Sequence, residues 1–403
     1  MSQPDDKRKN VRPIAPPVWF LALCTAGGVV GLTVLTPILP LVKSGLGVSS
    51  ADVQQLLTVY LIAVALGHLI CGPLSDRYGR RPILLSGAVL FAVAGAVLVV
   101  TEKIDWLVFW RIVQGFGAAA CMAMSRAMVN DAFERSEAAR QMSTISMVLS
   151  IAPALSLAFA GFLAERAGWK STMVLLFVWG LITLALGYFV AAETHVNKLR
   201  KINFRTVGLA YVAVLRDRLF ICWTLASGMQ VGIFFCLNAL LAYQYQRNGY
   251  TLSEFGLWFS LTPVFYLFGN TFNRLWFVSR GIERAAMIGC TFSAMSVVAM
   301  FVTQTLGFTH ALSLALPCCV FGFCNGIIIA NSTVGAISAS GEHAGTGTGI
   351  VGAWQMATGG IAGAIIVALG GARLFSVAAG GLMVMSAVSV LAMLVVYRQR
   401  EAE

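Results

Sequence analysis

The chain has 403 residues, of which 58% are hydrophobic and 11% are charged, and its mean hydropathy is +0.81. Because soluble domains carry about 25% charged residues, this composition excludes an ordinary soluble protein and indicates an integral membrane protein. The formal net charge of +11 is spread over short polar segments and forms no basic domain, which argues against a nucleic-acid-binding protein.

Apolar stretches of membrane-spanning length recur along the whole chain. A spanning helix needs about 20 mostly apolar residues. The alternating pattern of membrane β-strands is absent, so helices are left as the structure that satisfies the backbone in lipid. We therefore expect an all-α membrane protein with twelve transmembrane helices, at residues 18–42, 54–74, 82–101, 106–129, 141–164, 171–191, 219–243, 255–277, 285–304, 310–332, 346–369 and 374–397.

The positions of the Lys and Arg residues predict the orientation of these helices. With the N-terminus in the cytoplasm, the inner polar segments hold twenty of the 28 basic residues, the outer segments hold six, and Arg111 and Arg126 fall within a span. Cytoplasmic segments of membrane proteins are enriched in Lys and Arg. Both termini are therefore expected in the cytoplasm.

The polar segments divide the chain into two halves of six spans each. We expect a cytoplasmic tail at 1–17, a six-helix bundle at 18–191, a cytoplasmic linker at 192–218, a second six-helix bundle at 219–397 and a cytoplasmic tail at 398–403. The nine cysteines lie in the apolar spans without a C-x-x-C pair, so we interpret them as small core residues and predict no metal site.

A charged sequence separates the second and third spans. It reads Gly72-Pro73-Leu74-Ser75-Asp76-Arg77-Tyr78-Gly79-Arg80-Arg81. Its glycines allow a sharp turn, its aspartate can cap a helix N-terminus, and its three arginines keep it on the cytoplasmic side. Position for position, this sequence resembles the loop between the second and third helices of the major facilitator superfamily. The resemblance implies two six-helix bundles around a midplane cavity that opens alternately to each side.

Further sequences resemble one branch of that superfamily, the Bcr/CflA (bicyclomycin-resistance-type) drug transporters. They are Arg111-Ile112-Val113-Gln114-Gly115-Phe116-Gly117, Ser125-Arg126-Ala127-Met128-Val129-Asn130-Asp131-Ala132-Phe133, Ile151-Ala152-Pro153 and Gly168-Trp169-Lys170. The chain departs from the branch at Thr33, where members often carry an aspartate, and in the fifth span, where Leu157 and Ala160-Gly161 replace a proline and paired glycines.

This resemblance implies a secondary efflux transporter in the bacterial inner membrane. It would export an amphipathic, drug-like small molecule by alternating access, driven by protons, as a monomer in the lipid bilayer and without a cofactor. Two alternatives stay open: an exporter of an endogenous siderophore with anionic groups, and an importer of an anionic nutrient. The chain contains no catalytic motif of the common hydrolase or nucleotide-binding types, so we predict no enzyme and no catalytic residue.

The resemblance also implies a gate at the cytoplasmic face. In the superfamily, an arginine of the loop pairs with an acid that ends the fourth span, here Arg80 and Asp131, while Asp76 sits at the start of the eleventh span. Such pairs would hold the outward-open state, and the alternative is solvated charges that pair weakly. The predicted gating residues are Gly72, Asp76, Arg77, Gly79, Arg80 and Asp131. We expect Pro37 and Pro153 to bend their helices.

None of the 17 carboxylates lies in the middle of a span. Proton relays and cation sites in membranes normally use buried acids, so their absence argues against a cavity that binds cations. Arg111 is the candidate that remains. It could receive an anionic or carbonyl-rich substrate group; alternatively, it snorkels outward or bonds to Gln114 and neighbouring carbonyls. We interpret Arg126 as structural.

Polar and aromatic residues within the spans are candidates for the cavity wall. We predict substrate contacts for Arg111, Gln114, Asn238, Tyr266 and Gln355. Other polar candidates are Tyr60, His68, Gln230, Tyr243, Asn270, Asn325 and Asn331, and the aromatic candidates are Trp223, Trp258, Phe265 and Trp354. His68 is the single histidine in the interior of a predicted span, and we expect it to be packed and hydrogen-bonded.

Overall fold

The computed structural model describes residues 14–133, 135–195, 204–277, 281–341 and 344–402, and these are almost entirely helical. The elements are α1 (Val18–Thr33), η1 (Thr36–Ile38), α2 (Leu39–Leu46), α3 (Ser50–Tyr78), α4 (Arg80–Val100), α5 (Ile104–Ala132), α6 (Arg135–Ala167), α7 (Lys170–Val190), α8 (Phe204–Leu215), α9 (Arg218–Arg247), α10 (Leu252–Phe272), η2 (Asn273–Phe277), α11 (Ile282–Thr305), α12 (Leu312–Ala339), α13 (Ala344–Ala368) and α14 (Phe375–Ala402).

Eleven helices within the described residues are long and apolar enough to cross a membrane, counting Val18–Leu46 as one. The chain is therefore a multi-pass membrane protein. The eleven include every predicted span except 255–277, which forms α10 and the short π-helical turn η2. The helix α10 carries the polar residues Glu254, Ser260 and Asn270 along its length. The twelfth crossing stays a prediction.

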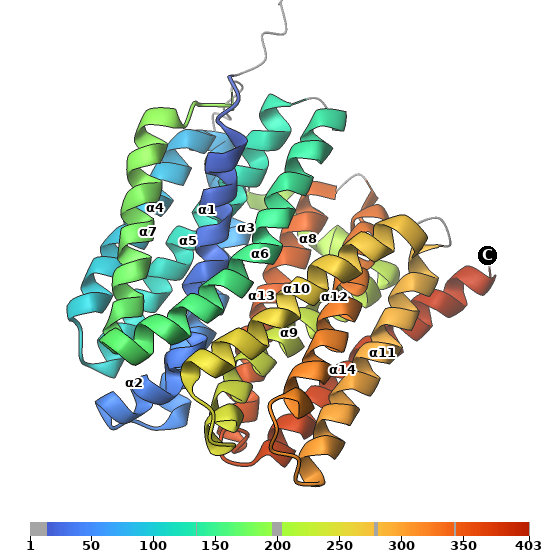
Figure 1. The fold of residues 1–403 in the computed structure, drawn as a ribbon. Coiled ribbons are helices and arrows are strands. Elements are labelled where there is room, and N and C mark those ends of the chain that lie inside the picture. The colour runs from blue at the N-terminus through green and yellow to red at the C-terminus, as the bar shows by residue number, and fades with distance from the viewer. Residues whose placement is uncertain (1–13, 134, 196–203, 278–280, 342–343, 403) are drawn as a thin grey trace, which may run out of the picture.

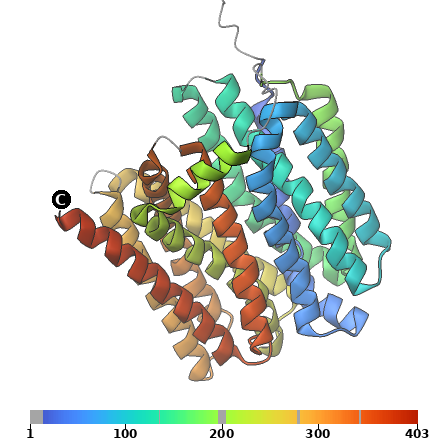
Figure 2. The ribbon, with the colours of Figure 1, turned by 180° about the vertical axis from the view of Figure 1, so that it is seen from behind.

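The helices are arranged as two bundles (Figures 1 and 2). Helices α1 to α7 pack against one another, with α5 in contact with α1, α3 and α4. Helices α9 to α14 form the second bundle, in which α12 packs on α9, α10 and α11. The most extensive contacts between the bundles join α6 to α10 and α3 to α13. Two helix pairs thus form the seam along which the bundles meet.

Small residues allow close helix approach inside the first bundle. A Cβ added at Gly117 of α5 would lie 2.7 Å from the backbone nitrogen of Phe91 on α4. A Cβ added at Gly180 of α7 would lie 2.7 Å from the Cα of Ala92, also on α4. Since lipid tails give no hydrophobic drive to helix association, such close packing is a main source of bundle stability.

Two predicted boundaries differ from the structure. The linker 192–218 contains the helix α8, and the part of it at residues 196–203 lies outside the described residues. The helix α9 begins at Arg218, where the carboxylate of Asp217 accepts a hydrogen bond of 2.6 Å from the backbone N–H of Phe220. The tail 398–403 is not separate, because α14 continues through Ala402. Capping and helix propagation extend both helices into polar sequence that hydropathy assigns to loops.

We name the two ends of the molecule by what they carry. The termini face carries the start of α1, the α3–α4 turn and the end of α14, and it is uppermost in Figure 1. The far face carries α2 and the turns at residues 101–103, 168–169, 248–251, 306–311 and 369–374.

Candidate functional site

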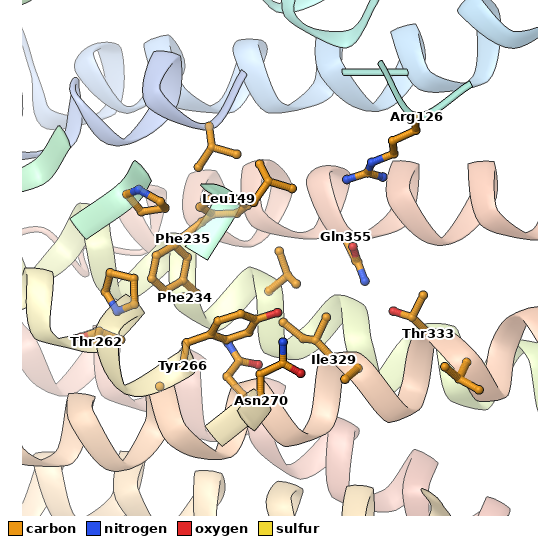
Figure 3. Close-up of a pocket in the computed structure, with 18 residues that line it drawn as sticks. Arg126, Leu149, Phe234, Phe235, Thr262, Tyr266, Asn270, Ile329, Thr333 and Gln355 are labelled. Carbon is orange, nitrogen blue, oxygen red and sulfur yellow. The ribbon is translucent and has the colours of Figure 1, made fainter. Parts of the chain in front are cut away.

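A cavity of about 460 Å³ lies between the two bundles. Helices α1, α5 and α6 of the first bundle and α9, α10, α12 and α13 of the second contribute to its wall (Figure 3). Its lining residues are Val29, Arg126, Leu149, Pro153, Val231, Phe234, Phe235, Thr262, Pro263, Tyr266, Asn270, Gly322, Asn325, Ile329, Ala330, Thr333, Val334 and Gln355. Because both bundles line it, the cavity must change shape when the bundles move relative to each other.

The cavity has an apolar, aromatic part and a polar part. Phe234 and Phe235 lie at one side, with ring centroids 5.5 Å apart. Figure 3 shows Arg126 and Gln355 pointing into the space away from these rings, from opposite walls. A concave site with an apolar wall and a few polar groups is the usual form of a small-molecule site.

One described residue of the cavity wall is charged, and it is Arg126. No Asp or Glu is among the described lining residues. Arg126 lies six residues before the end of α5, which places it about 9 Å from the termini-face end of that helix. The interpretation of Arg126 as a structural residue is therefore not supported by its position, since its side chain faces the cavity.

Within the described residues, the hydrogen bonds that join a side chain of one bundle to the other bundle lie toward the far face. The backbone N–H and the hydroxyl of Ser253 on α10 donate to the Glu165 carboxylate on α6, at 2.8 and 2.5 Å. The Thr58 hydroxyl on α3 donates to the Gly360 carbonyl on α13 at 3.1 Å. The bundles are thus held together on the far-face side of the cavity.

Backbone packing reinforces this far-face contact. A Cβ added at Gly161 of α6 would lie 2.5 Å from the carbonyl oxygen of Leu252, and one added at Gly256 of α10 would lie 2.7 Å from the carbonyl oxygen of Leu157. The two helices therefore touch through their backbones, which excludes larger side chains at both glycines.

At the termini face, Arg80 joins several elements of the first bundle. Its guanidinium lies 2.7 Å from the Asp76 carboxylate and 3.0 Å from the Asp131 carboxylate. Its backbone N–H donates to Glu193 at 2.9 Å, and the Thr194 hydroxyl donates to Asp131 at 3.2 Å. The start of α4 is thereby tied to α3, to the end of α5 and to the segment after α7.

The sequence Gly72 to Arg81 is not the loop that was expected. The helix α3 continues through Gly72 and Asp76, and Gly79 alone separates it from α4. Gly79 has φ +103°, a conformation that L side chains rarely adopt, so the sharp turn depends on this glycine. Asp76 lies in the last turn of α3 and does not cap α4. Arg77 is exposed, with its guanidinium 5.1 Å from the Tyr78 ring centroid.

The expected contact of Asp76 with the start of the eleventh span involves residues 342–345, which lie outside the residues and side chains that the structure describes. In the described part, Asp76 and Asp131 both pair with Arg80, within one bundle. The gating role of this cluster stays a prediction.

Of the two interpretations of Arg111, the structure matches the alternative one, in which it bonds to Gln114 and a neighbouring carbonyl, and Arg111 is not among the described residues that line the cavity. Arg111 is fully buried, and its guanidinium donates to the Leu56 carbonyl at 3.2 Å and to the Gln114 side-chain oxygen at 2.6 Å. It also lies 4.0 Å from the Tyr60 ring centroid. The Tyr60 hydroxyl in turn donates to the Gly28 carbonyl at 2.7 Å. Arg111 and Gln114 thus join α5 to α3 and, through Tyr60, to α1.

The physical reason is the position of Arg111 along α5. It lies about 10 Å from the far-face end of the helix, where the bundles are closed. Arg126 follows 15 residues later, about 22 Å nearer the termini face, where the cavity lies.

Of the three other predicted substrate residues outside α5, two line the cavity and one does not. Tyr266 and Gln355 line the cavity. Asn238 does not: it borders a separate small void with Gln54 and Thr36, and its amide has no hydrogen-bond partner among the described residues. Asn238 lies about one turn beyond Phe234 toward the far face, and Phe235 borders both this void and the cavity.

The two predicted bending prolines lie at different kinds of site. Pro37 follows the end of α1, inside the 3-10 turn η1 that separates α1 from α2. Pro153 lies within α6 and lines the cavity with Leu149. Proline has no N–H to donate to the carbonyl one turn earlier, so α6 is weakened beside the cavity.

Sequence reasoning predicted Tyr266 but missed the other two aromatic side chains among the described lining residues, Phe234 and Phe235. None of the four aromatic residues predicted for substrate is among the described lining residues. Trp223 packs over Gly335, and Phe265 is exposed on the outside of the bundle. Adjacent phenylalanines in the middle of the seventh span were the available signal, but hydropathy does not tell a lipid-facing ring from a cavity-facing one.

His68 lies at the seam between the bundles. Its Nδ1 would be 3.8 Å from a Cβ added at Gly352 of α13, and it lies within electrostatic range of Arg126. Both ring nitrogens are buried without a hydrogen-bond partner in the described part of the chain. The expectation of a hydrogen-bonded histidine was therefore wrong.

The fold and the cavity define a class of protein: a membrane-embedded transporter with two helical bundles around a central site. Residues 21–364 match the family model described as Major Facilitator Superfamily. The chain belongs to this superfamily, and this membership indicates a transporter rather than an enzyme.

Curated relatives match most of the chain. The bicyclomycin resistance protein homolog of Haemophilus influenzae is 25% identical, over 81% of this chain and 83% of its own length. The chloramphenicol resistance protein of Pseudomonas aeruginosa is 24% identical, over 79% of this chain and 76% of its own length. Multidrug resistance protein D of Escherichia coli is 24% identical, over 83% and 84%. The predicted likeness to bicyclomycin-resistance-type transporters is thereby confirmed.

Solved structures show the same fold at low sequence identity. A D-xylose-proton symporter superposes with a TM-score of 0.72 at 16% identity, covering 94% of this chain and 96% of that chain. A bacterial homolog of the human lysosomal transporter Spinster, in an inward-facing and unoccupied conformation, superposes with a TM-score of 0.67 at 13% identity, covering 94% of both chains.

Proposed function

We propose that this protein is a secondary efflux transporter that exports an amphipathic, drug-like small molecule across the bacterial inner membrane by alternating access, driven by protons. The observation that carries the proposal is the 460 Å³ cavity, which has an aromatic and a polar part and is lined by both bundles. The printed names of the relatives, which include bicyclomycin, chloramphenicol and multidrug resistance proteins, support export of drug-like molecules.

We place the termini face in the cytoplasm, because the polar segments on that side hold most of the Lys and Arg residues. The far face then lies outside. In this orientation the conformation described above is the cytoplasm-facing one, since the bundles are joined on the far-face side of the cavity. Substrate would enter from the cytoplasm or the inner leaflet.

Transport then requires the far-face contacts to break. Separation of α6 from α10 and of α3 from α13 would open the cavity outward, while the bundles approach at the termini face. The Arg80 cluster lies at that face, and we assign it to the closed gate of the outward-facing state. The loss of the hydrogen bonds to Glu165 and Gly360 would be offset by new contacts there.

Proton coupling needs a group that titrates near the cavity, and its wall has no carboxylate among the described residues. We propose His68, whose imidazole lies between α3 and α13 without a hydrogen-bond partner in the described part. The ordinary pKa of histidine lies near neutral pH, and in this conformation burial and the neighbouring Arg126 keep His68 uncharged. A charge gained at this seam, next to Arg126, would favour separation of the bundles.

An exporter of an endogenous siderophore with anionic groups is the second candidate. The observation in its favour is that the described residues of the cavity wall include no Asp or Glu, which suits an anionic cargo better than a cation. The two candidate functions, siderophore export and drug export, differ in the molecule that is carried but share the direction of transport.

Everted membrane vesicles test the proposal. Vesicles that contain the protein should accumulate chloramphenicol when an inward-acidic proton gradient is imposed, and a protonophore should abolish the accumulation. The His68→Asn protein should lose the dependence on the gradient while binding chloramphenicol as before. Equal accumulation in vesicles with and without the protein, for chloramphenicol and for a catecholate siderophore alike, would contradict an efflux function.

A further inference from the structure

Arg126 presents an unpaired cation to the cavity. Its side chain is partly buried and lines the cavity wall, and within the described residues its guanidinium makes no hydrogen bond and no ion pair. An ionised side chain at membrane depth is costly, and such residues usually pair with a neighbour or serve a ligand. Whether Arg126 pairs within the protein or binds a ligand therefore depends on the charged and polar groups around it.

The nearest acid along α5 is already engaged. Asp131 follows Arg126 by five residues, and its carboxylate accepts from Arg80 at 3.0 Å and from Thr194 at 3.2 Å. The other ionisable neighbour, His68, cannot neutralise a cation. No Asp or Glu lines the cavity in the described part of the chain. Among the described residues, neither bundle thus supplies Arg126 with a counter-charge.

Other polar groups of the cavity also lack protein partners. Gln355 and Thr333 line the cavity from the second bundle, and neither side chain is hydrogen-bonded within the described residues. Asn325 is 3% exposed, and its side-chain oxygen is buried without a partner. Buried polar groups are rarely left unpaired in folded proteins. Together they form a binding surface for a polar ligand group.

The rest of the wall suits an apolar ligand body. Phe234 and Phe235 provide aromatic rings, and Pro153, Pro263 and Val231 provide aliphatic surface. Phe234 is itself supported by Phe259, with stacked rings whose centroids are 6.0 Å apart. A ligand that fills the cavity therefore has an aromatic or aliphatic body at one end and an anionic group at the other.

We propose that the exported substrates are amphipathic organic anions whose carboxylate, or an equivalent planar oxyanion, binds Arg126, while the apolar body packs against Phe234 and Phe235. This inference rests on the proposed function and names its substrate class. The guanidinium matches a carboxylate bidentately, and Gln355 and Thr333 complete the polar contacts from the opposite bundle. Because the ligand then touches both bundles, its binding favours the conformation in which they enclose it.

A matched pair of probes tests the proposal. 1-Naphthaleneacetate and 1-naphthaleneacetamide share one aromatic body and differ in the charge of the head group. Binding of each is measured by calorimetry on the purified full-length protein in nanodiscs. A charge-assisted hydrogen bond contributes about 1.5–3 kcal/mol, so the acid should bind roughly 10- to 100-fold more tightly than the amide. The Arg126→Gln protein should bind both probes with the amide's affinity.

Two variants serve as controls. Arg216→Gln, which changes an exposed arginine at the end of the linker, should keep the full preference for the acid. Arg126→Lys keeps the charge but loses bidentate geometry, so it should keep part of the preference. If Arg126→Gln binds neither probe, Arg126→Lys serves as the test instead. A preference of Arg126→Lys for the acid supports the proposal. Equal binding of acid and amide by Arg126→Lys contradicts it.

The outcomes separate this inference from the proposed function. Equal binding of acid and amide by the unaltered protein, or a preference that survives in Arg126→Gln, overturns the anion site, even where vesicles still transport chloramphenicol. A preference that depends on Arg126, in a protein that transports no probe, supports the anion site and contradicts the efflux function.

Discussion

Ser253 at the start of α10 donates both its backbone N–H and its hydroxyl to the carboxylate of Glu165 at the end of α6, at 2.8 and 2.5 Å. These hydrogen bonds cross from one bundle to the other on the far-face side of the cavity. Charged acceptors form stronger hydrogen bonds than neutral ones, so this contact is a main link between the bundles in the present conformation.

Replacement of Glu165 by Ala should therefore favour the far-face-open state. Spin labels at Lys103→Cys and Phe308→Cys, both exposed on far-face turns of different bundles, report the separation by pulsed electron paramagnetic resonance. The native cysteines are all buried and should not be labelled. We expect the distance distribution of Glu165→Ala to gain a longer component.

Glu102 provides the matched control. Its carboxylate lies 2.6 Å from the Lys170 ammonium, within the first bundle. The hydrogen bond from Lys170, together with its charge, lowers the pKa of Glu102 below the ordinary value, so the pair stays ionised at neutral pH and is lost only on acidification below the usual range for glutamate. Glu102→Gln should leave the distances unchanged. If Glu165→Ala and Glu102→Gln gave the same distance distribution, the contact between Ser253 and Glu165 would not hold the bundles together.

The two glycines of the α3–α4 junction should respond differently to alanine. Gly79 has φ +103°, so Gly79→Ala places a Cβ in a strained conformation and should lower the free energy of unfolding by about 1–3 kcal/mol. Gly72 is helical, and a Cβ there meets no atom within 4 Å, so Gly72→Ala should be neutral or stabilise by about 0.5–1 kcal/mol. Thermal unfolding in detergent measures both. Equal effects of the two substitutions would contradict a turn that depends on Gly79 alone.

Arg111 should contribute to the stability of the fold and not to the preference for an anionic ligand. Arg111→Gln removes the contacts with Leu56, Gln114 and Tyr60 and leaves buried polar groups without partners, so it should lower the unfolding free energy by about 2–5 kcal/mol. Tyr60→Phe, which removes only the hydroxyl contact with Gly28, should cost about 1 kcal/mol. The preference for the naphthalene acid over the amide should persist in both proteins that remain folded. Loss of that preference in Tyr60→Phe would place the anion site at Arg111 instead.

The cavity phenylalanines should act on both probes alike. Phe234→Ala removes aromatic surface from the cavity wall, and burial of an aromatic side chain contributes about 1.5–3 kcal/mol, so acid and amide should each bind roughly tenfold more weakly. Phe265→Ala, at a residue exposed on the outside of the bundle, should leave both affinities as they are. Calorimetry on the two variants checks this prediction. If Phe265→Ala weakened binding more than Phe234→Ala, the apolar subsite would lie elsewhere.

Hydropathy and charge predicted the class of fold, because lipid requires long apolar helices and the basic residues gather on one side. The same signal left out the helix α8 and the continuation of α3 beyond residue 74 to Tyr78, since capping and helix propagation extend helices into polar sequence. It also listed 255–277 with the other spans, and this segment is not among the eleven helices within the described residues that are long and apolar enough to cross a membrane.

The candidate site was predicted only in part. Tyr266 and Gln355 line the cavity as expected, Arg111 makes the contact with Gln114 that was its alternative interpretation, and Arg126, expected to be structural, lines the cavity. Both arginines lie on one helix, and a sequence does not show where along that helix the bundles separate. The depth of the cavity depends on the contacts of α6 with α10 and of α3 with α13, which are tertiary contacts between distant parts of the chain.

The central claim is that one cavity between two bundles opens alternately to the two faces. The most direct test measures both faces in the protein reconstituted in nanodiscs, with the far-face pair Lys103→Cys and Phe308→Cys and a termini-face pair Tyr188→Cys and Arg284→Cys. On addition of 1-naphthaleneacetate at acidic pH, the far-face distance should lengthen while the termini-face distance shortens. Distances that stay constant at both faces, or that change in the same direction, would contradict the account.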